Sequence, residues 1–195
     1  MDIISEIEKE AKKFYEGSEG CHGWEHTERV RALCTQIGRE ENANLKILEL
    51  AAILHDIGRK FEEENEKICH AEKSAELARA ILAQHGAEQK EILEIAHCIE
   101  CHRFRGNKIP QSKEAKILFE SDKLDAIGAI GIGRAFLFGG EHNLGLSAAH
   151  DEFNVKLSKI KKMMQTETGK KVAEERHAFM ETFFERMEKE IGGEL

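Results

Sequence analysis

Four residues in three separate segments have side chains that can hold a divalent metal ion. His26 stands in CHGWEHTERV, His55 and Asp56 stand side by side in LHDIG, and Asp122 opens DKLDA. Two imidazole nitrogens and two carboxylate oxygens suit a borderline or hard ion such as Mn²⁺, Fe²⁺, Zn²⁺, Co²⁺ or Ni²⁺. Four protein ligands leave such an ion open positions for water and substrate oxygens, as in hydrolytic and oxidative centres. His22 precedes His26 by four residues, and we expect only His26 of this pair to be a ligand.

Three of these residues, His26, His55 and Asp122, lie on apolar stripes of predicted helices, and Asp56 stands beside His55. A lone histidine on such a stripe is more often a hydrogen-bonded core residue than a ligand. Two buried carboxylates beside two imidazoles are unfavourable, however, unless a cation lies between them. The combination therefore favours a metal site. Steps of three and four residues, which follow one face of a helix, connect His26 with Val30 and Leu33, His55 with Ala51 and Ala52, and Asp122 with Leu118 and Asp125.

Two further histidines stand at predicted helix ends. His70 opens a helix whose apolar stripe continues through Ser74 and Leu77, and His102 ends a stripe that runs through Ile99. Both could complete a second metal position or bind a phosphate group. Equally, they could be ordinary helix-terminal histidines, with His102 favourably placed near the negative end of its helix. The sequence leaves these alternatives open.

Helices must position these ligands, and apolar residues recur at helical spacing along nearly the whole chain. Segment 45–58, LKILELAAILHDIG, is almost continuously apolar, so we expect a buried central helix there. Asn44 and Ser112 are of the types that cap helices. No stretch alternates as a strand does, and the chain has one proline. Helices are predicted over residues 2–15, 23–40, 45–58, 70–85, 88–104, 112–138, 147–165 and 168–191.

Composition fits a single all-α domain over residues 1–195, built as a helical bundle. A net charge of −8 disfavours nucleic-acid binding, which needs a basic face. No apolar run approaches the ~20 residues that span a bilayer, and the opening MDIISEIEKEAKK is not a signal peptide. We therefore expect a cytoplasmic protein, monomer or homodimer, without membrane or nucleic-acid partners. Its five cysteines are then expected to be reduced.

The order of the candidate ligands resembles the H…HD…D signature of the HD-domain metal-dependent phosphohydrolases. The stretches HGWEHTERV, LHDIGRK, HAEKSAELA and DKLDAIGAIGIGRAF are similar to a prokaryotic subgroup of small stand-alone HD hydrolases, some of which hydrolyse nucleotides. The resemblance covers about residues 20–140. It implies an all-α HD core over this range, with the C-terminal helices of residues 147–192 expected to pack on it.

The resemblance also implies a divalent ion held by His26, His55, Asp56 and Asp122. Mn²⁺ and Fe²⁺ are the favoured ions among Mn²⁺, Mg²⁺, Co²⁺, Ni²⁺, Fe²⁺ and Zn²⁺. Asp125 competes with Asp122 as fourth ligand. Asp122 is preferred because the aspartate of the family directly precedes a basic-leucine pair, which leaves Asp125 to orient a ligand or a cation.

The implied reaction is hydrolysis of a phosphate ester or anhydride in a nucleotide or another small phosphorylated metabolite. The expected catalytic residues are Asp56, which could accept a proton from water, together with Lys60 and Asp125. Some HD phosphatases have an acid-base glutamate shortly after the His-Asp pair. Here Arg59 and Lys60 stand closest, before Glu62 to Glu64. The expected phosphate-binding residues are Arg59, Lys60, His70, His102 and Arg103.

Three alternatives remain at the level of the sequence. In an HD-type di-iron oxygenase, His70 and His102 would help to hold a second iron. In a non-catalytic helical module, the metal would be structural. Cys98 and Cys101 form a CxxC that could belong to a zinc site, but two thiols one helical turn apart, without a second CxxC, are more simply small buried side chains.

Overall fold

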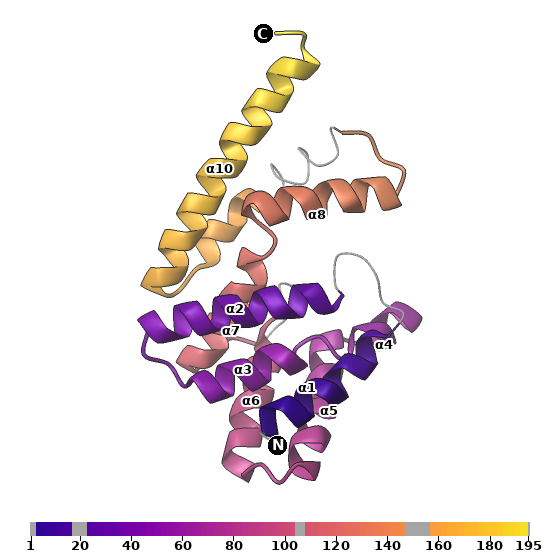
Figure 1. The fold of residues 1–195 in the computed structure, drawn as a ribbon, viewed down its shortest axis with the longest axis vertical. Helices are drawn as coiled ribbons and strands as arrows, with labels where there is room; N and C mark the ends of the chain where they lie inside the picture. Colours follow the sequence, from indigo (N-terminus) through magenta and orange to yellow (C-terminus); the bar gives the residue numbers. More distant parts are fainter. Residues whose placement is uncertain (1–2, 17–22, 104–107, 147–156, 195) are drawn as a thin grey trace. The chain divides into compact units, whose positions relative to one another are not determined.

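The structure, a computed structural model, describes residues 3–16, 23–103, 108–146 and 157–194. Within these ranges every regular element is a helix and none is a strand, which confirms the all-α prediction. None of these helices has both the length and the apolar character needed to cross a membrane. The elements are α1 (Ile3–Lys12), η1 (Lys13–Tyr15), α2 (Trp24–Glu40), α3 (Leu45–Leu54), α4 (Arg59–Glu64), α5 (His70–Gln84), α6 (Gln89–Cys101), α7 (Lys113–Leu124), α8 (Gly128–Glu141), η2 (Leu157–Met163) and α10 (Glu167–Ile191) (Figure 1).

The chain divides into two compact units, Met1–Asp122 and Lys123–Leu195. In the first unit α3 is the central helix, because it packs against α1, α2, α5 and α6. Nearly all its residues from Ile47 to Leu54 are buried, as its apolar sequence predicts. The Asn44 side chain caps the helix by accepting hydrogen bonds from the backbone N–H groups of Lys46 and Ile47. The single-domain organisation of residues 1–195 stays a prediction.

The predicted helix over residues 45–58 is too long, because α3 ends at Leu54 and residues 55–58 form a turn before α4. Gly58 explains the break. Its N–H donates to Ser74 Oγ on α5 at 2.8 Å, and a Cβ at this position would lie 2.5 Å from Ser74 N. Only glycine allows so close an approach of the two chain segments. The turn holds His55 and Asp56 between α3 and α4.

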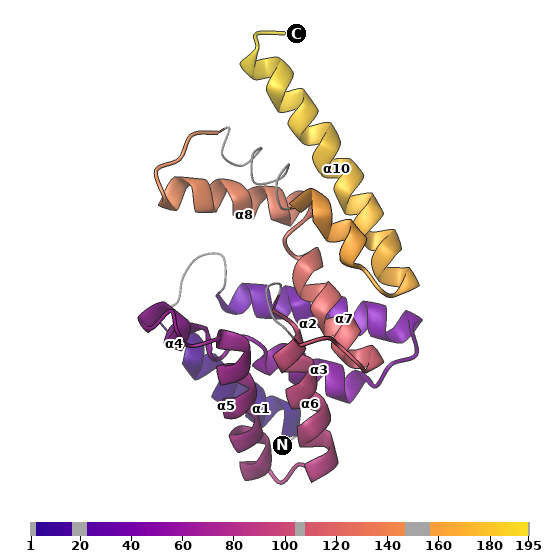
Figure 2. The same cartoon turned by 180° about the vertical axis from the view of Figure 1, so that it is seen from behind.

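Helices α5 and α6 form a hairpin that packs on the central helix (Figure 2). Gly86 adopts a φ of +73° after α5, a left-handed conformation that ends helices and suits glycine. The hairpin places His70 at the start of α5 and His102 directly after the end of α6. Both positions agree with the sequence-based prediction of helix-terminal histidines.

The predicted helix over residues 112–138 is also wrong, because the chain forms α7 and α8 with a break at residues 125–127. Gly128 begins α8 with a φ of +81°, and a Cβ on Gly131 would lie 2.4 Å from the carbonyl oxygen of Ala126. The predicted cap at Ser112 is present, since Ser112 Oγ accepts a hydrogen bond from Ala115 N at 3.1 Å.

The second unit is built on α10, which packs against α8 and η2. The rings of Phe136 and Phe183 pack edge to face with centroids 6.1 Å apart, and Met180 and Phe184 are buried. The predicted helix over residues 168–191 is confirmed by α10. Of the predicted helix over residues 147–165, residues 147–156 lie outside the described residues, and the following segment contains the 3₁₀ helix η2.

Candidate metal centre

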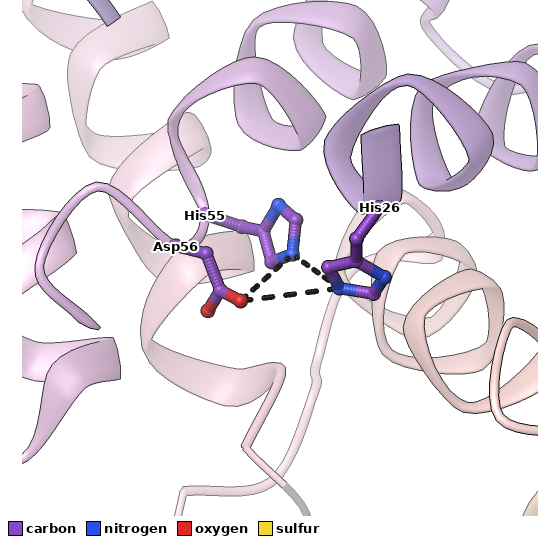
Figure 3. A group of neighbouring side chains, drawn as sticks. All are labelled: His26, His55 and Asp56. Atoms are coloured by element: carbon purple, nitrogen blue, oxygen red, sulfur yellow. Dashed lines mark hydrogen bonds and ion pairs between the residues drawn. The ribbon is translucent and has the colours of Figure 1, made fainter. Parts of the chain in front are cut away.

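His26, His55 and Asp56 converge in the interior of the first unit (Figure 3). His26 lies in the first turn of α2, and the other two residues directly follow α3. His26 Nε2 lies 3.4 Å from His55 Nε2 and 3.9 Å from Asp56 Oδ2, and His55 Nε2 lies 3.7 Å from the same Asp56 oxygen. The three residues are at most 2% exposed. Their donor atoms are thus close enough together to bind one metal ion.

Asp122 extends this cluster from α7. Its Oδ1 lies 3.3 Å from His26 Nε2, and its side chain is 16% exposed. Asp125 belongs to the second unit, where its buried carboxylate accepts a hydrogen bond from Arg134 Nη1 at 2.5 Å. Asp122 therefore meets the histidine cluster within the first unit, whereas Asp125 has a cationic partner of its own. The ligand role of Asp122 stays a prediction.

His55 is held in the form that binds metal ions. Its Nδ1 donates to the carbonyl oxygen of Ala52 at 2.7 Å. Because a carbonyl can only accept, the ring proton lies on Nδ1, and Nε2 turns a lone pair toward His26 and Asp56. Burial lowers the pKa of His55 to about 4. The ring is therefore neutral at physiological pH, as metal binding requires.

Asp56 is an anion inside the protein. Burial alone would raise its pKa, but the positive charge of the Arg59 guanidinium holds the pKa well below its ordinary value. Arg59 Nε donates to Oδ2 of Asp56 at 2.8 Å, and Nη2 donates to Oδ1 at 3.1 Å. Arg59, predicted to bind phosphate, is therefore engaged with a candidate metal ligand. This bidentate contact fixes the orientation of the carboxylate.

The second oxygen of Asp56 faces another pair of histidines. Asp56 Oδ1 lies 3.3 Å from His102 Nε2 and 3.7 Å from His70 Nε2. The rings of His70 and His102 are 5.2 Å apart, and both residues are buried. Asp56, His70 and His102 form a second group with metal-binding geometry, which shares Asp56 with the first group. The structure thus brings His70 and His102 to the candidate ligands, while their roles in binding a metal or a phosphate stay predictions.

Lys60 and Arg103, both predicted to bind phosphate, have different surroundings. Lys60 is exposed on α4 and makes no hydrogen bond or ion pair with any residue that the structure describes. Arg103 Nη2 lies 2.8 Å from Glu62 Oε1. Glu62 also contacts His70, with Oε2 and Nδ1 2.5 Å apart. The sequence did not single out Glu62, because nothing distinguishes it from the adjacent Glu63 and Glu64.

The other candidates from the sequence contribute no further cluster within the described part of the chain. His22 lies outside the described residues. Cys98 and Cys101 are both buried free thiols, with Cys101 Sγ 3.7 Å from His97 Nδ1. Neither of the two groups with metal-binding geometry found among the described residues contains a cysteine. The simpler interpretation of the CxxC, two small buried side chains, agrees with this geometry.

The donor set fits a divalent cation. Neutral imidazole nitrogens and ionised carboxylate oxygens are ligands for first-row divalent metals. They meet at a place where an uncompensated carboxylate is costly. The second-sphere contacts, from a carbonyl to His55 and from Arg59 to Asp56, are of the kind that orient metal ligands. The His-Asp cluster can therefore hold a divalent metal ion. Two basic residues stand close to it in the sequence, Lys60 four residues after Asp56 and Arg103 directly after His102.

The sequence pattern of the HD domain family matches residues 23–127 of the chain, a range that includes all the candidate ligands. The chain is 37% identical to the uncharacterized protein YpgQ of Bacillus subtilis over 180 residues, which cover 88% of this chain and 85% of YpgQ. The similarity thus extends beyond the HD core into the C-terminal helices.

Solved structures agree with this assignment. The crystal structure of Bacillus subtilis YpgQ in complex with ADP superposes with a TM-score of 0.78 at 32% identity, covering 96% of this chain and 94% of YpgQ. An HD-superfamily hydrolase from Bacillus thuringiensis superposes with a TM-score of 0.78 at 30% identity, covering 97% of this chain and 96% of the hydrolase. The resemblance inferred from the motifs is confirmed, and the chain belongs to the HD domain family.

Proposed function

We propose that the protein is a metal-dependent phosphohydrolase that cleaves a phosphate ester or anhydride bond of a nucleotide. The observation that carries the proposal is the meeting of His26, His55 and Asp56 with Asp122 in the core of an HD fold. The similarity to an HD-superfamily hydrolase supports hydrolysis. The ADP bound to YpgQ supports a nucleotide over other small phosphorylated metabolites. We expect the protein to act in the cytoplasm, as a monomer or homodimer.

His26, His55, Asp56 and Asp122 would hold the metal ion, for which Mn²⁺ or Fe²⁺ is favoured. A bound divalent ion lowers the pKa of a water ligand and neutralises charge on the phosphoryl group. The neutral His55 and the ionised Asp56 are already in the protonation states that this ligand set needs. Asp56 also has a second oxygen, directed toward His102, that can accept the proton of the attacking water.

The remaining residues would bind and orient the substrate. Lys60 lies on α4 directly after Arg59. It is an exposed cation without a protein partner among the described residues. Its ammonium group can hold a phosphate oxygen. Arg103 follows α6 and brings a further cationic donor to the side of Asp56 that faces His102. Asp125 would act indirectly, by orienting Arg134.

A second candidate function is that of a di-iron oxygenase, favoured by one observation. Asp56 is shared between two groups that each have metal-binding geometry, the second of which contains His70 and His102. Two ions bridged by one carboxylate would suit oxygen chemistry as well as hydrolysis. Iron-dependent colour and oxygen uptake, without release of phosphate, would support this candidate over the phosphohydrolase.

A turnover screen tests the proposal. The metal-stripped protein receives Mn²⁺, Mg²⁺, Co²⁺, Ni²⁺, Fe²⁺ or Zn²⁺ singly, with nucleoside mono-, di- and triphosphates and simple phosphomonoesters as substrates. Phosphate and pyrophosphate are measured separately, so that the products show which bond is cut. We expect metal-dependent release that is abolished in Asp56→Ala, a variant that should still fold. Release that persists in Asp56→Ala, or no release with any ion, would contradict the proposal.

A purely structural metal gives a different result in the same experiment. The protein would retain such a metal tightly and would show no turnover with any substrate. Removing the metal with a chelator would unfold the chain. Circular dichroism of the metal-stripped protein therefore accompanies the screen.

A further inference from the structure

In the two metal-binding groups, His55, His102 and His70 each have a hydrogen-bond partner at Nδ1. The partner is a main-chain carbonyl in two cases and a carboxylate in the third. His55 and His102 each donate Nδ1–H to a main-chain carbonyl three residues earlier, with Nδ1···O distances of 2.7 Å to Ala52 and 2.6 Å to Ile99. Both follow the C-terminal ends of helices, α3 and α6, where carbonyl groups lack helical partners. The helix end itself therefore fixes their tautomer and directs Nε2 at Asp56.

His70 has no such carbonyl available, because it is the first residue of α5. The N-terminal end of a helix presents N–H groups, and those are donors. In place of a carbonyl, His70 Nδ1 contacts the carboxylate of Glu62 at 2.5 Å. The other oxygen of this carboxylate pairs with the guanidinium of Arg103. A carboxylate in such an ion pair is a hydrogen-bond acceptor only, so the proton of the contact lies on His70 Nδ1.

Glu62 is itself fixed from two sides. Its Oε1 lies 2.8 Å from Arg103 Nη2, so each of its carboxylate oxygens has a partner. Helix α4, which carries Glu62, starts directly after the turn of Asp56, and Arg59 N donates to Asp56 O at 3.0 Å. The glutamate is thus tied to the same chain segment as the shared ligand.

We propose that Glu62 is a positioning residue of the candidate site. By accepting Nδ1–H, it holds His70 as the tautomer whose Nε2 turns a lone pair toward Asp56. The proposal rests on the function proposed above and refines it. His70 takes an electropositive partner, either a cation or the proton of a water or hydroxyl group, and does not donate to a phosphate oxygen. Phosphate recognition is then left to Lys60 and the other cationic groups.

The tautomer can be measured directly by ¹⁵N NMR on the metal-free protein labelled at histidine, at mildly alkaline pH. Two-bond ring correlations distinguish a protonated from an unprotonated nitrogen, and His70→Gln identifies the His70 signals. We expect Nδ1–H in the wild type and in the control Glu63→Ala, which alters an exposed neighbour on α4. In Glu62→Ala the Nε2–H form should appear. An unchanged tautomer in Glu62→Ala, or Nε2–H in the wild type, would overturn the proposal.

A double-mutant cycle tests whether Glu62 acts through His70. With the nucleotide that the screen finds to be cleaved fastest, Glu62→Ala should lower kcat/KM by about 10- to 100-fold, the usual effect of losing a contact behind a ligand. In the His70→Gln background the same substitution should have no further effect, and losses that simply add would contradict the proposal. If the wild type shows no turnover, the proposed function fails, and the NMR result alone decides the role of Glu62.

Discussion

Arg59 donates to both carboxylate oxygens of Asp56, from Nε to Oδ2 at 2.8 Å and from Nη2 to Oδ1 at 3.1 Å. Each oxygen also faces a different pair of histidines, with His26 and His55 on the side of Oδ2 and His70 and His102 on the side of Oδ1. Arg59 therefore sets the direction of the one carboxylate that the two groups share. It also supplies the positive charge that lets Asp56 remain ionised in the core.

Replacing Arg59 with methionine should expose this electrostatic role. Arg59→Met leaves Asp56 as a buried anion without its cation, so the free energy of unfolding of the metal-free protein should fall by about 3 kcal/mol. Lys60→Met, at an exposed neighbouring position, should change it by less than about 0.5 kcal/mol. Urea denaturation measures both values.

The same variant should gain more stability from a divalent ion than the wild type gains, because the ion supplies the missing charge. Repeating the denaturation with saturating Mn²⁺ tests this. An equal or smaller gain in Arg59→Met would show that the ion does not bind next to Asp56.

Substitutions at Asp122 and Asp125 should have different effects on the affinity for a metal ion. Asp122→Asn removes the negative charge of a carboxylate whose Oδ1 lies 3.3 Å from His26 Nε2, so the affinity for Mn²⁺ should fall at least about tenfold. Asp125→Asn should leave the affinity nearly unchanged but lower stability, because Arg134 loses its charged partner. Calorimetric titration together with thermal unfolding distinguishes the two effects. A larger loss of affinity in Asp125→Asn would make Asp125 the fourth ligand.

The buried histidines predict a loss of stability in acid. Burial lowers the pKa of both His55 and His70 from an ordinary value of 6.5 to about 4. Between these values the unfolded chain binds protons that the folded chain does not. The free energy of unfolding of the metal-free protein should therefore decrease as the pH falls from 6.5 toward 4. Urea titrations across this range measure the slope, which should be smaller in His55→Gln. A constant free energy across the range would show that folding does not lower the pKa values of His55 and His70.

Gly58 should tolerate no side chain. A Cβ there would lie 2.5 Å from Ser74 N and 2.7 Å from His70 O, both main-chain atoms that cannot move aside cheaply. Gly58→Ala should destabilise the protein by about 1–3 kcal/mol and weaken Mn²⁺ binding, because it displaces the turn of Asp56.

A second glycine provides the control. Gly133 lies within α8, and a Cβ at this position would meet no described atom within 4 Å, so Gly133→Ala should stabilise the helix by up to about 1 kcal/mol. Thermal unfolding compares the two variants. Equal effects would mean that the contact between Gly58 and α5 does not constrain the turn.

The convergence of the candidate ligands could be predicted from the sequence. His26, His55 and Asp122 each lie on an apolar stripe, and such stripes face a common core in a helical bundle. This explains why three segments far apart in the chain bring their polar groups to one place. The HD pair itself lies in a turn, however, since the close approach of Gly58 to Ser74 ends α3 early. That contact joins residues far apart in the sequence and leaves no periodic signal.

The partners of the ligands could not be predicted. Arg59 stands next to Lys60, and both have the charge to bind phosphate, yet only Arg59 folds back onto Asp56. Glu62 is the first of three consecutive glutamates, and only the short helix α4 turns it toward His70. Both choices depend on a helix of six residues whose sequence, RKFEEE, has no apolar periodicity to indicate it.

The most direct test of the account is to locate the ion. Crystals grown with Mn²⁺ and a non-hydrolysable nucleotide, with diffraction data collected at a wavelength where manganese scatters anomalously, would show where the metal binds. The account predicts an anomalous peak in direct contact with Nε2 of both His26 and His55 and with carboxylate oxygens of Asp56 and Asp122. A peak elsewhere, or a fully ordered cluster of these four side chains with no peak at saturating Mn²⁺, would contradict it.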